Sequence, residues 1–343
     1  MKNNSKRRVD MRRLLTLIPI LLLLGALALP AMAGVTCDGH LRLGGRTGEI
    51  TTKVGQTSTT TKDTQLQEPK VNLNIKGDVA DGVKALVELR EEGGRRPVVR
   101  QALIELTNLI PGVSLRAGRI KLPSGGLQSV DNANSMENPL IDESISYSDI
   151  ITLDTGAEAT LALDPVESTV TLGIFRGGVP NDKPALLLKG AAKPVEGLDV
   201  SLLFYTSDET KKDAGALKDV ITTYALTGQY KLPEPALTIK GMVGRNTHEE
   251  GDKKPETTCF GLQGSYDFNE MFWGALRFAN STKKEEKKED SKSTEIAVGG
   301  GCNLAENTKI KVQWRSVKDE NVGGVKGAEK TINALAGEIV VAF

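Results

Sequence analysis

The chain has 343 residues, 44 basic and 44 acidic side chains, and three cysteines. Its length suffices for one large domain or two domains of ordinary size. The balanced charge excludes a general electrostatic attraction to nucleic acid, so we expect no nucleic-acid partner. Cys37, Cys259 and Cys302 are too few and too scattered for a disulfide framework or a zinc site.

The first 33 residues have the organisation of an export signal. Basic residues between Lys6 and Arg13 precede the apolar run LLTLIPILLLLGALALP, and Ala31-Met32-Ala33 supplies the small residues of a cleavage site. We predict a signal peptide over residues 1–33 and a mature chain over 34–343, with an uncleaved anchor as the alternative. Removing six basic residues and one acid leaves 38 basic against 43 acidic side chains, so the mature chain is mildly acidic.

Apolar and polar residues alternate in segments of about ten residues along the mature chain. KVNLNIKG places Val71, Leu73 and Ile75 on one face, and this period of two predicts a strand. We expect about sixteen strands, which start near His40, Lys70, Gly82, Val98, Val113, Gly156, Thr169, Pro184, Leu198, Val220, Ala236, Thr258, Met271, Thr294, Thr308 and Ile332.

The connections between these segments alternate between short and long. Compact turns such as DVAD, KPVEG and DFNE are followed by long polar loops such as TSDETKKDAGALK and STKKEEKKEDSK. This alternation is typical of an up-and-down barrel that crosses a membrane. We therefore predict an all-β fold, an antiparallel transmembrane β-barrel of about 16 strands.

The C-terminal segment LAGEIVVAF ends on Phe343 with no polar tail. An apolar strand at the end of a chain is protected from aggregation when both of its edges are paired. We expect it to pair with the first strand near HLRLGG and close the barrel. The terminal phenylalanine also resembles the signal that outer-membrane assembly machinery recognises.

Aromatic residues make up 4% of the chain, and none precedes Tyr147. Membrane barrels usually carry aromatic girdles at both interfaces. This scarcity leaves a secreted soluble solenoid or sandwich open as an alternative.

One connection, between VSLRAGRIKLP and TGAEATLALD, is longer than thirty residues. A loop of that length is usually functional. The segment NLIPGVSLRAGRIKLPSGG resembles porins of the phosphate-selective O/P type. The resemblance implies a homotrimeric outer-membrane porin whose third long loop folds into the pore, passing small hydrophilic solutes by diffusion. The step Pro123-Ser124-Gly125 lacks an aromatic residue between Pro and Gly, so we carry over the porin class without its phosphate selectivity.

Alternation also predicts which charged residues line the pore. If the apolar faces meet lipid, a set of basic residues faces inward, which we call the basic wall. Two acids, Glu88 and Glu338, face inward with it. This wall comprises Arg42, Arg46, Lys70, Lys76, Lys84, Arg90, Arg116, Lys309, Lys311 and Arg315. Arg119 and Lys121 have the opposite parity unless Gly118 marks a bulge.

The long loop carries acids that would oppose this wall: Asp131, Glu137, Asp142, Glu143 and Asp149. A basic wall facing an acidic loop sets a field across the constriction and predicts a weak preference for anions. The alternative is ordinary solvation of a water-filled lumen.

Catalytic motifs are missing from the sequence. It has two histidines and contains neither G-x-S-x-G nor H-E-x-x-H, so we expect a protein that is not an enzyme and needs no cofactor or metal. The expected partners are outer-membrane lipid and small polar or anionic solutes. The alternative function is a structural or adhesive barrel with a plugged lumen and partner-binding loops.

Overall fold

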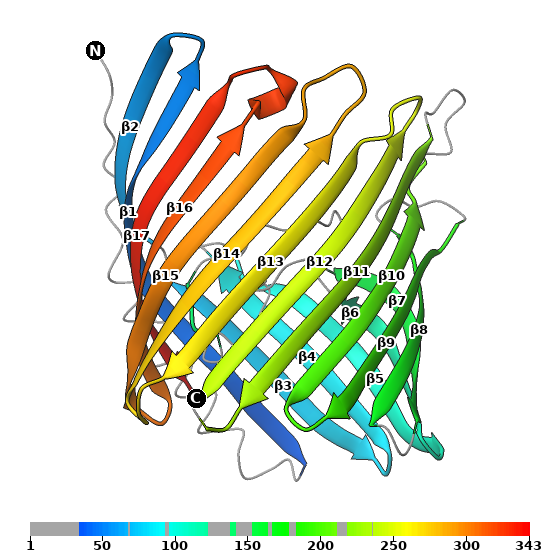
Figure 1. Cartoon of the computed structure of the whole chain (residues 1–343). Helices are drawn as coiled ribbons and strands as arrows, with labels where there is room; N and C mark the ends of the chain where they lie inside the picture. The colour runs from blue at the N-terminus through cyan, green and yellow to red at the C-terminus, as the bar shows by residue number, and fades with distance from the viewer. Residues whose placement is uncertain are drawn as a thin grey trace.

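The computed structural model of the chain describes residues 34–67, 69–92, 96–122, 138–141, 153–163, 167–177, 183–210, 218–234 and 236–343. These residues form one antiparallel sheet that closes on itself as a barrel (Figure 1). Within these ranges the single helical element is a 3-10 turn, Val322–Gly324, and no helix there is long and apolar enough to cross a membrane.

Seventeen strands build the described part of the barrel. They are β1 Val35–Val54, β2 Thr57–Leu66, β3 Lys70–Ala80, β4 Val83–Glu92, β5 Val98–Ile110, β6 Val113–Lys121, β7 Leu153–Leu163, β8 Ser168–Phe175, β9 Ala185–Val195, β10 Leu198–Asp208, β11 Asp219–Leu232, β12 Leu237–Glu250, β13 Glu256–Asp267, β14 Phe272–Lys284, β15 Ser291–Ala305, β16 Thr308–Glu320 and β17 Glu329–Ala342.

Two of these strands share one position in the barrel. The edge of β1 that faces away from β17 pairs with β3 from Val35 to Arg42 and with β2 from Gly45 to Val54. The seventeen strands therefore occupy sixteen positions, as the sequence predicts. The sequence does not predict β2, because TSTTTKDTQL has no apolar alternation and all ten side chains are exposed.

The two ends of the chain meet at a seam between β1 and β17. Their register runs from His40 opposite Ala342 to Lys53 opposite Glu329. The Gly39 N–H donates to the Phe343 carbonyl oxygen at 2.9 Å, and the Phe343 N–H donates to the Gly39 carbonyl oxygen at 3.0 Å. A Cβ at Gly39 would lie 2.9 Å from the Phe343 ring, so the absence of a side chain at Gly39 leaves room for this ring. The predicted closure is confirmed.

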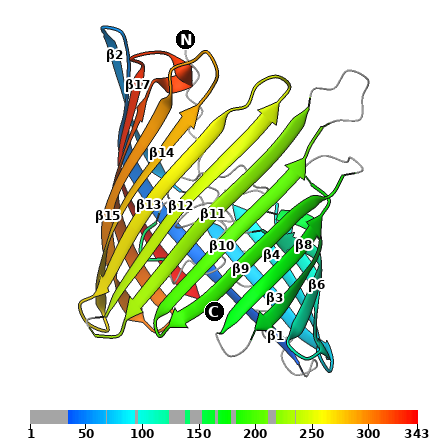
Figure 2. The same cartoon turned by 45° about the vertical axis from the view of Figure 1, so that its right-hand side comes forward.

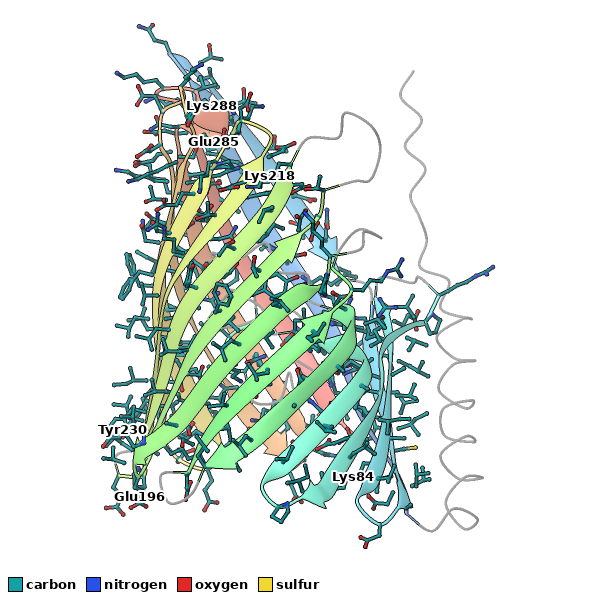
Figure 3. The ribbon with its side chains drawn as sticks, turned by 90° about the vertical axis from the view of Figure 1, so that its right-hand side faces the viewer. Lys84, Glu196, Lys218, Tyr230, Glu285 and Lys288 are labelled. Carbon is teal, nitrogen blue, oxygen red and sulfur yellow. The ribbon has the colours of Figure 1, made fainter. Side chains whose placement is uncertain are left out.

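The barrel wall is higher on one side. Strands β11–β17 contain 12 to 15 residues each, whereas β6–β10 contain 8 to 11, and Figure 2 shows the resulting slope of the rim. Short turns gather at one end, near Glu196 and Tyr230. Long loops gather at the other, near Lys218, Glu285 and Lys288 (Figure 3).

The two faces of the wall have opposite chemistry. In β16, Val312 and Trp314 are 50% and 43% exposed on the outside, while Lys311 and Gln313 on the inside are 1% exposed. On this side of the barrel a polar interior lies under an apolar exterior, which is the inverse of a water-soluble protein and the arrangement of a membrane barrel. Across the lumen, the inner face also carries an apolar cluster that includes Ile120, Phe175 and Tyr205.

Candidate functional site

The inner wall at the seam contains a cluster of two cations around one carboxylate, which we call the seam triad. Arg42 of β1 binds Glu338 of β17 at 2.6 Å, and Lys311 of β16 lies 3.3 Å from the other oxygen of the same carboxylate. The side chains of Lys311 and Glu338 are 1% and 2% exposed. Adjacent strands therefore hold two positive charges against one negative charge.

A second cluster, the β15 triad, repeats this arrangement on the neighbouring strands. The Nε of Arg277 on β14 donates to Glu295 on β15 at 2.8 Å, and Arg315 on β16 lies 3.3 Å from the other carboxylate oxygen. Arg277 and Glu295 are fully buried. Sequence reasoning missed both residues, although Arg277 lies between the outward-facing Leu276 and Phe278 and the same alternation could have found it.

Other predicted cations also meet partners on the inner face. Arg116 binds Glu158 through its Nε at 2.7 Å, and Lys76 binds Asp38 at 2.6 Å. The Lys309 Nζ lies 5.3 Å from the centre of the Trp273 ring.

The remaining predicted cations occupy inner-face positions on β1, β3 and β4. Arg90 is buried, Arg46 and Lys70 are half-buried, and Lys84 is exposed beside a short turn (Figure 3). Among the predicted cations, the structure brings these into ion pairs with carboxylates of the described chain: Arg42, Lys76, Arg116, Lys311 and Arg315.

Gly118 does not form a bulge. Its register with Leu103 of β5 and Gly156 of β7 is continuous, despite its positive φ of 131°. Arg119 therefore shares the outward parity of Leu115 and is exposed, so neither Arg119 nor Lys121 joins the basic wall by a shift of register.

The five predicted loop acids lie outside the described residues, but the short segment 138–141 of the same loop is described. Leu140 is 1% exposed and packs against Ala275 and Ala297 on the inner face of β14 and β15. The Ile141 N–H donates to the Gln313 Oε1 at 2.7 Å. This segment is therefore anchored on the wall formed by β14, β15 and β16.

Two glycines of β15 make room for these contacts. A Cβ at Gly299 would lie 2.8 Å from Leu140, and a Cβ at Gly301 would lie 2.6 Å from the Trp273 ring. Both positions face inward, so the missing side chains leave a slot that Leu140 and Trp273 fill. Sequence reasoning missed this slot, although glycine inside a strand often marks a close approach of another group.

The electrostatic consequence of the two triads is a local excess of positive charge. Each triad has two cations around one carboxylate. Charges inside a narrow, low-dielectric passage act strongly on a passing ion, whereas charges on exposed loops are screened within about 8–10 Å. The charges of the two triads therefore lie where a passing ion would sense them most strongly.

The fold agrees with those of known proteins. The outer membrane channel DcaP of Acinetobacter baumannii aligns with a TM-score of 0.68 at 12% identity, over 92% of this chain and 98% of that one. An anion-selective porin from Comamonas acidovorans aligns with a TM-score of 0.64 at 17% identity, over 90% and 99%. A trimer form of OmpT, an outer membrane protein of Vibrio cholerae, aligns with a TM-score of 0.63 at 12% identity, over 90% and 99%.

These similarities in structure show the fold. No curated protein matches the chain in sequence. The family model of the Gram-negative porins matches residues 21–332, which is most of the chain. The chain therefore belongs to the Gram-negative porin family, and its barrel is a passive channel of the outer membrane.

Proposed function

We propose that this porin is a constricted diffusion pore for small hydrophilic solutes with a weak preference for anions. The observation that carries the proposal is the pair of triads on the inner wall, each with two cations around one carboxylate. The remaining inward cations, such as Lys309 beside Trp273, add to the same field.

The long loop supplies the constriction in this proposal. With β2 and β3 in one position, β6 is fifth and β14 thirteenth of sixteen, so these strands lie eight positions apart on opposite sides of the barrel. The loop leaves the wall after β6 and returns at β7, yet its residues 138–141 contact β14, β15 and β16. This supports a loop that crosses the lumen, which would carry Asp131, Glu137, Asp142, Glu143 and Asp149 into the passage.

The proposal also includes a homotrimer that reaches the outer membrane after removal of residues 1–33. Support for the trimer comes from the trimer form of the Vibrio cholerae protein and from the aromatic-free outer face of β1–β9. The O/P-type resemblance of the segment before the long loop supports the porin class, and phosphate selectivity is not part of the proposal.

Reversal potentials in planar bilayers under a KCl gradient test the anion preference. The variant Lys309→Gln, Lys311→Gln, Arg315→Gln removes three inward cations but leaves Arg42 on Glu338 and Arg277 on Glu295, so each carboxylate keeps a partner. We expect the zero-current potential to move toward cation selectivity.

The matched control is Lys288→Gln, which removes a charge from an exposed loop and should leave the potential unchanged. An unchanged potential in the triple variant would contradict the proposed role of the wall. If the native protein produced no conductance steps at all, the barrel would be plugged and the adhesive or structural function would replace the diffusion pore.

A further inference from the structure

The inner wall contains a cavity apart from the two triads, although it shares Lys309 with the inward cations of the proposed anion pathway. It lies at the short-turn end of the lumen, between β12 and β16, and has a volume of about 590 Å³. Its lining includes inward side chains that can contact a solute: Thr238, Ser265, Asp267, Trp273, Asn303 and Lys309. Neither triad contributes a residue to it.

Trp273 gives this cavity a fixed aromatic surface. Its ring lies over Gly301, and its Nε1 donates to the Pro139 carbonyl oxygen at 3.4 Å. The Lys309 Nζ lies 5.3 Å from the centre of this ring. Trp273 is 8% exposed. Phe175 and Tyr205 are also buried on the inner face, but they lie in an apolar cluster, whereas Trp273 lines a cavity with polar and charged neighbours. Its placement indicates a function in contact with solute.

Asn303 gives the cavity an unused hydrogen-bond acceptor. Its Nδ2 donates to the Glu270 carbonyl oxygen at 2.6 Å, which fixes the orientation of the amide. Its Oδ1 is buried and accepts no hydrogen bond from the described part of the chain. Buried polar atoms normally have a partner, so this position is suited to a donor from outside the chain.

The mixture of charges restricts the class of ligand. The lining has carboxylates on Asp267 and Glu270 and one ammonium on Lys309. The carboxylates disfavour phosphate and other anions, and Lys309 disfavours a simple cation. Hydroxyl groups both donate and accept hydrogen bonds, so they can use the carboxylates, the Asn303 oxygen and the ammonium together.

The opposite charges of the cavity come from separate strands. Lys309 is on β16 and Asp267 is on β13, three strand spacings apart, and the Lys309 Nζ extends toward Trp273 of β14. A sugar ring can place its apolar C–H face near the indole and direct hydroxyls to both sides.

We propose that this cavity binds a neutral polyhydroxylated solute of the size of a mono- or disaccharide. Its volume lies within the ordinary range for small-ligand sites. The inference deepens the proposed function, on which it rests, because the solute reaches the cavity through the open lumen. The site would hold a sugar briefly at the short-turn mouth of the channel.

Intrinsic fluorescence can test the site, because the chain has two tryptophans, Trp273 and Trp314. The variant Trp314→Phe removes the outward-facing tryptophan and leaves Trp273 as the reporter. With the folded protein in lipid vesicles, titration with glucose or sucrose should give a saturable change in emission. The matched control, Trp273→Phe, keeps Trp314 on the outer face and should not respond.

A second variant tests the orphaned acceptor. In the Trp314→Phe background, Asn303→Ala should weaken the apparent sugar affinity roughly five- to tenfold, which corresponds to one lost hydrogen bond. Unchanged electrophoretic mobility before boiling would show that the barrel remains folded. An affinity equal to that of the parent would contradict the role assigned to Asn303.

Parallel titrations with inorganic phosphate, glycine and putrescine separate the ligand classes. A saturable response to one of these without a response to sugar would overturn the assignment, as would the absence of any saturable response. Conductance of the same preparation separates the two proposals. A conducting pore without a sugar response would overturn the site alone, whereas a barrel that does not conduct but responds to sugar would overturn the diffusion pore alone.

Discussion

The outer wall has two halves that differ in their side chains. Strands β10–β17 carry exposed aromatic residues, among them Tyr224, Phe260, Phe278 and Trp314. Strands β1–β9 contain a single aromatic residue, Phe175, which is 2% exposed on the inner face. The outer face of β1–β9 has no exposed aromatic residue and carries aliphatic side chains such as Ile104 and Leu172, so it is called the aliphatic half. The wall from β6 to β9 is also lower than the opposite wall (Figure 2).

Aromatic side chains in membrane barrels mark the interfaces between lipid and water. A half that faces protein instead of lipid does not meet this interface, so it does not need aromatic residues there. The difference between the halves therefore supports packing of the aliphatic half against other copies of the chain. It also accounts for the scarcity of aromatic residues, which the sequence alone presents as an objection to a barrel.

The largest expected effect concerns the seam, where the two halves are joined. Removing IVVAF from the C-terminus deletes the part of β17 that pairs with His40 to Leu43 and the bonds between Phe343 and Gly39. We expect a complete loss of inserted barrel, because an open edge in lipid leaves backbone groups without partners. Fractionation and the mobility difference between boiled and unboiled samples measure this.

Phe343→Tyr serves as its control and should insert normally, because it keeps the aromatic ring and the backbone bonds. Phe343→Lys should assemble poorly if the assembly machinery reads the terminal side chain. Normal insertion of the truncated chain would show that β17 is dispensable for closure.

The next largest effect is expected on the oligomer, and it is tested by the same substitution on the outer wall of each half. Ile104 on β5 and Leu276 on β14 are 52% and 57% exposed on the outer wall. Ile104→Trp should disrupt a tightly packed protein contact and release monomers, whereas Leu276→Trp should be tolerated because lipid adapts to the larger side chain. Cross-linking and native electrophoresis report the oligomer. Equal behaviour of the two variants would remove the support for an interface on the aliphatic half.

A smaller effect is expected inside the lumen. Removing residues 127 to 150 should raise single-channel conductance while the barrel still assembles, because these residues lie between strands. Leu140→Ala should act in the same direction with less effect, since it weakens a buried contact with Ala275 and Ala297 by about 2–5 kcal/mol but leaves the loop present. Unchanged conductance in the deletion variant would place the loop outside the ion pathway.

The smallest effect is expected from a single ion pair in the aliphatic half, between Arg116 of β6 and Glu158 of β7. Arg116→Gln removes one inward cation beside Glu158, compared with three in the variant described above, so its reversal potential should move less toward cation selectivity. Glu158→Gln should move the potential in the opposite direction. A shift of the same sign in both variants would show that the pair affects structure and not the field in the pore.

Most of the fold follows from local pattern. The strands that begin at Lys70, Val98, Val113, Leu198 and Thr308 start at the predicted residues. The alternation of apolar and polar residues and the turn residues depend only on neighbouring positions, so a single sequence is enough to predict the strands from them. The strand β2 was missed because its stability comes from pairing with β1 rather than from an apolar face.

The candidate site could be predicted only in part. Parity gives the direction of Arg42 and Lys311, but it does not reveal that Glu338 lies between them, because that contact depends on the register between strands far apart in the chain. The contact of Leu140 with the β15 slot was likewise beyond local reasoning. It joins a loop to a strand more than 150 residues later, and only the closed barrel brings them together.

The seam has a further consequence for the order of folding. Arg42 and Glu338 are separated by 296 residues along the chain, so bringing them together carries a loop-closure entropy of about 5 kcal/mol. No bond of the seam can form before the last strand has been synthesised, and isolated bonds between β1 and β17 could not offset that entropy. We therefore expect the whole ladder to form cooperatively, as a late step of folding that a catalyst of assembly can assist by holding the two edges together.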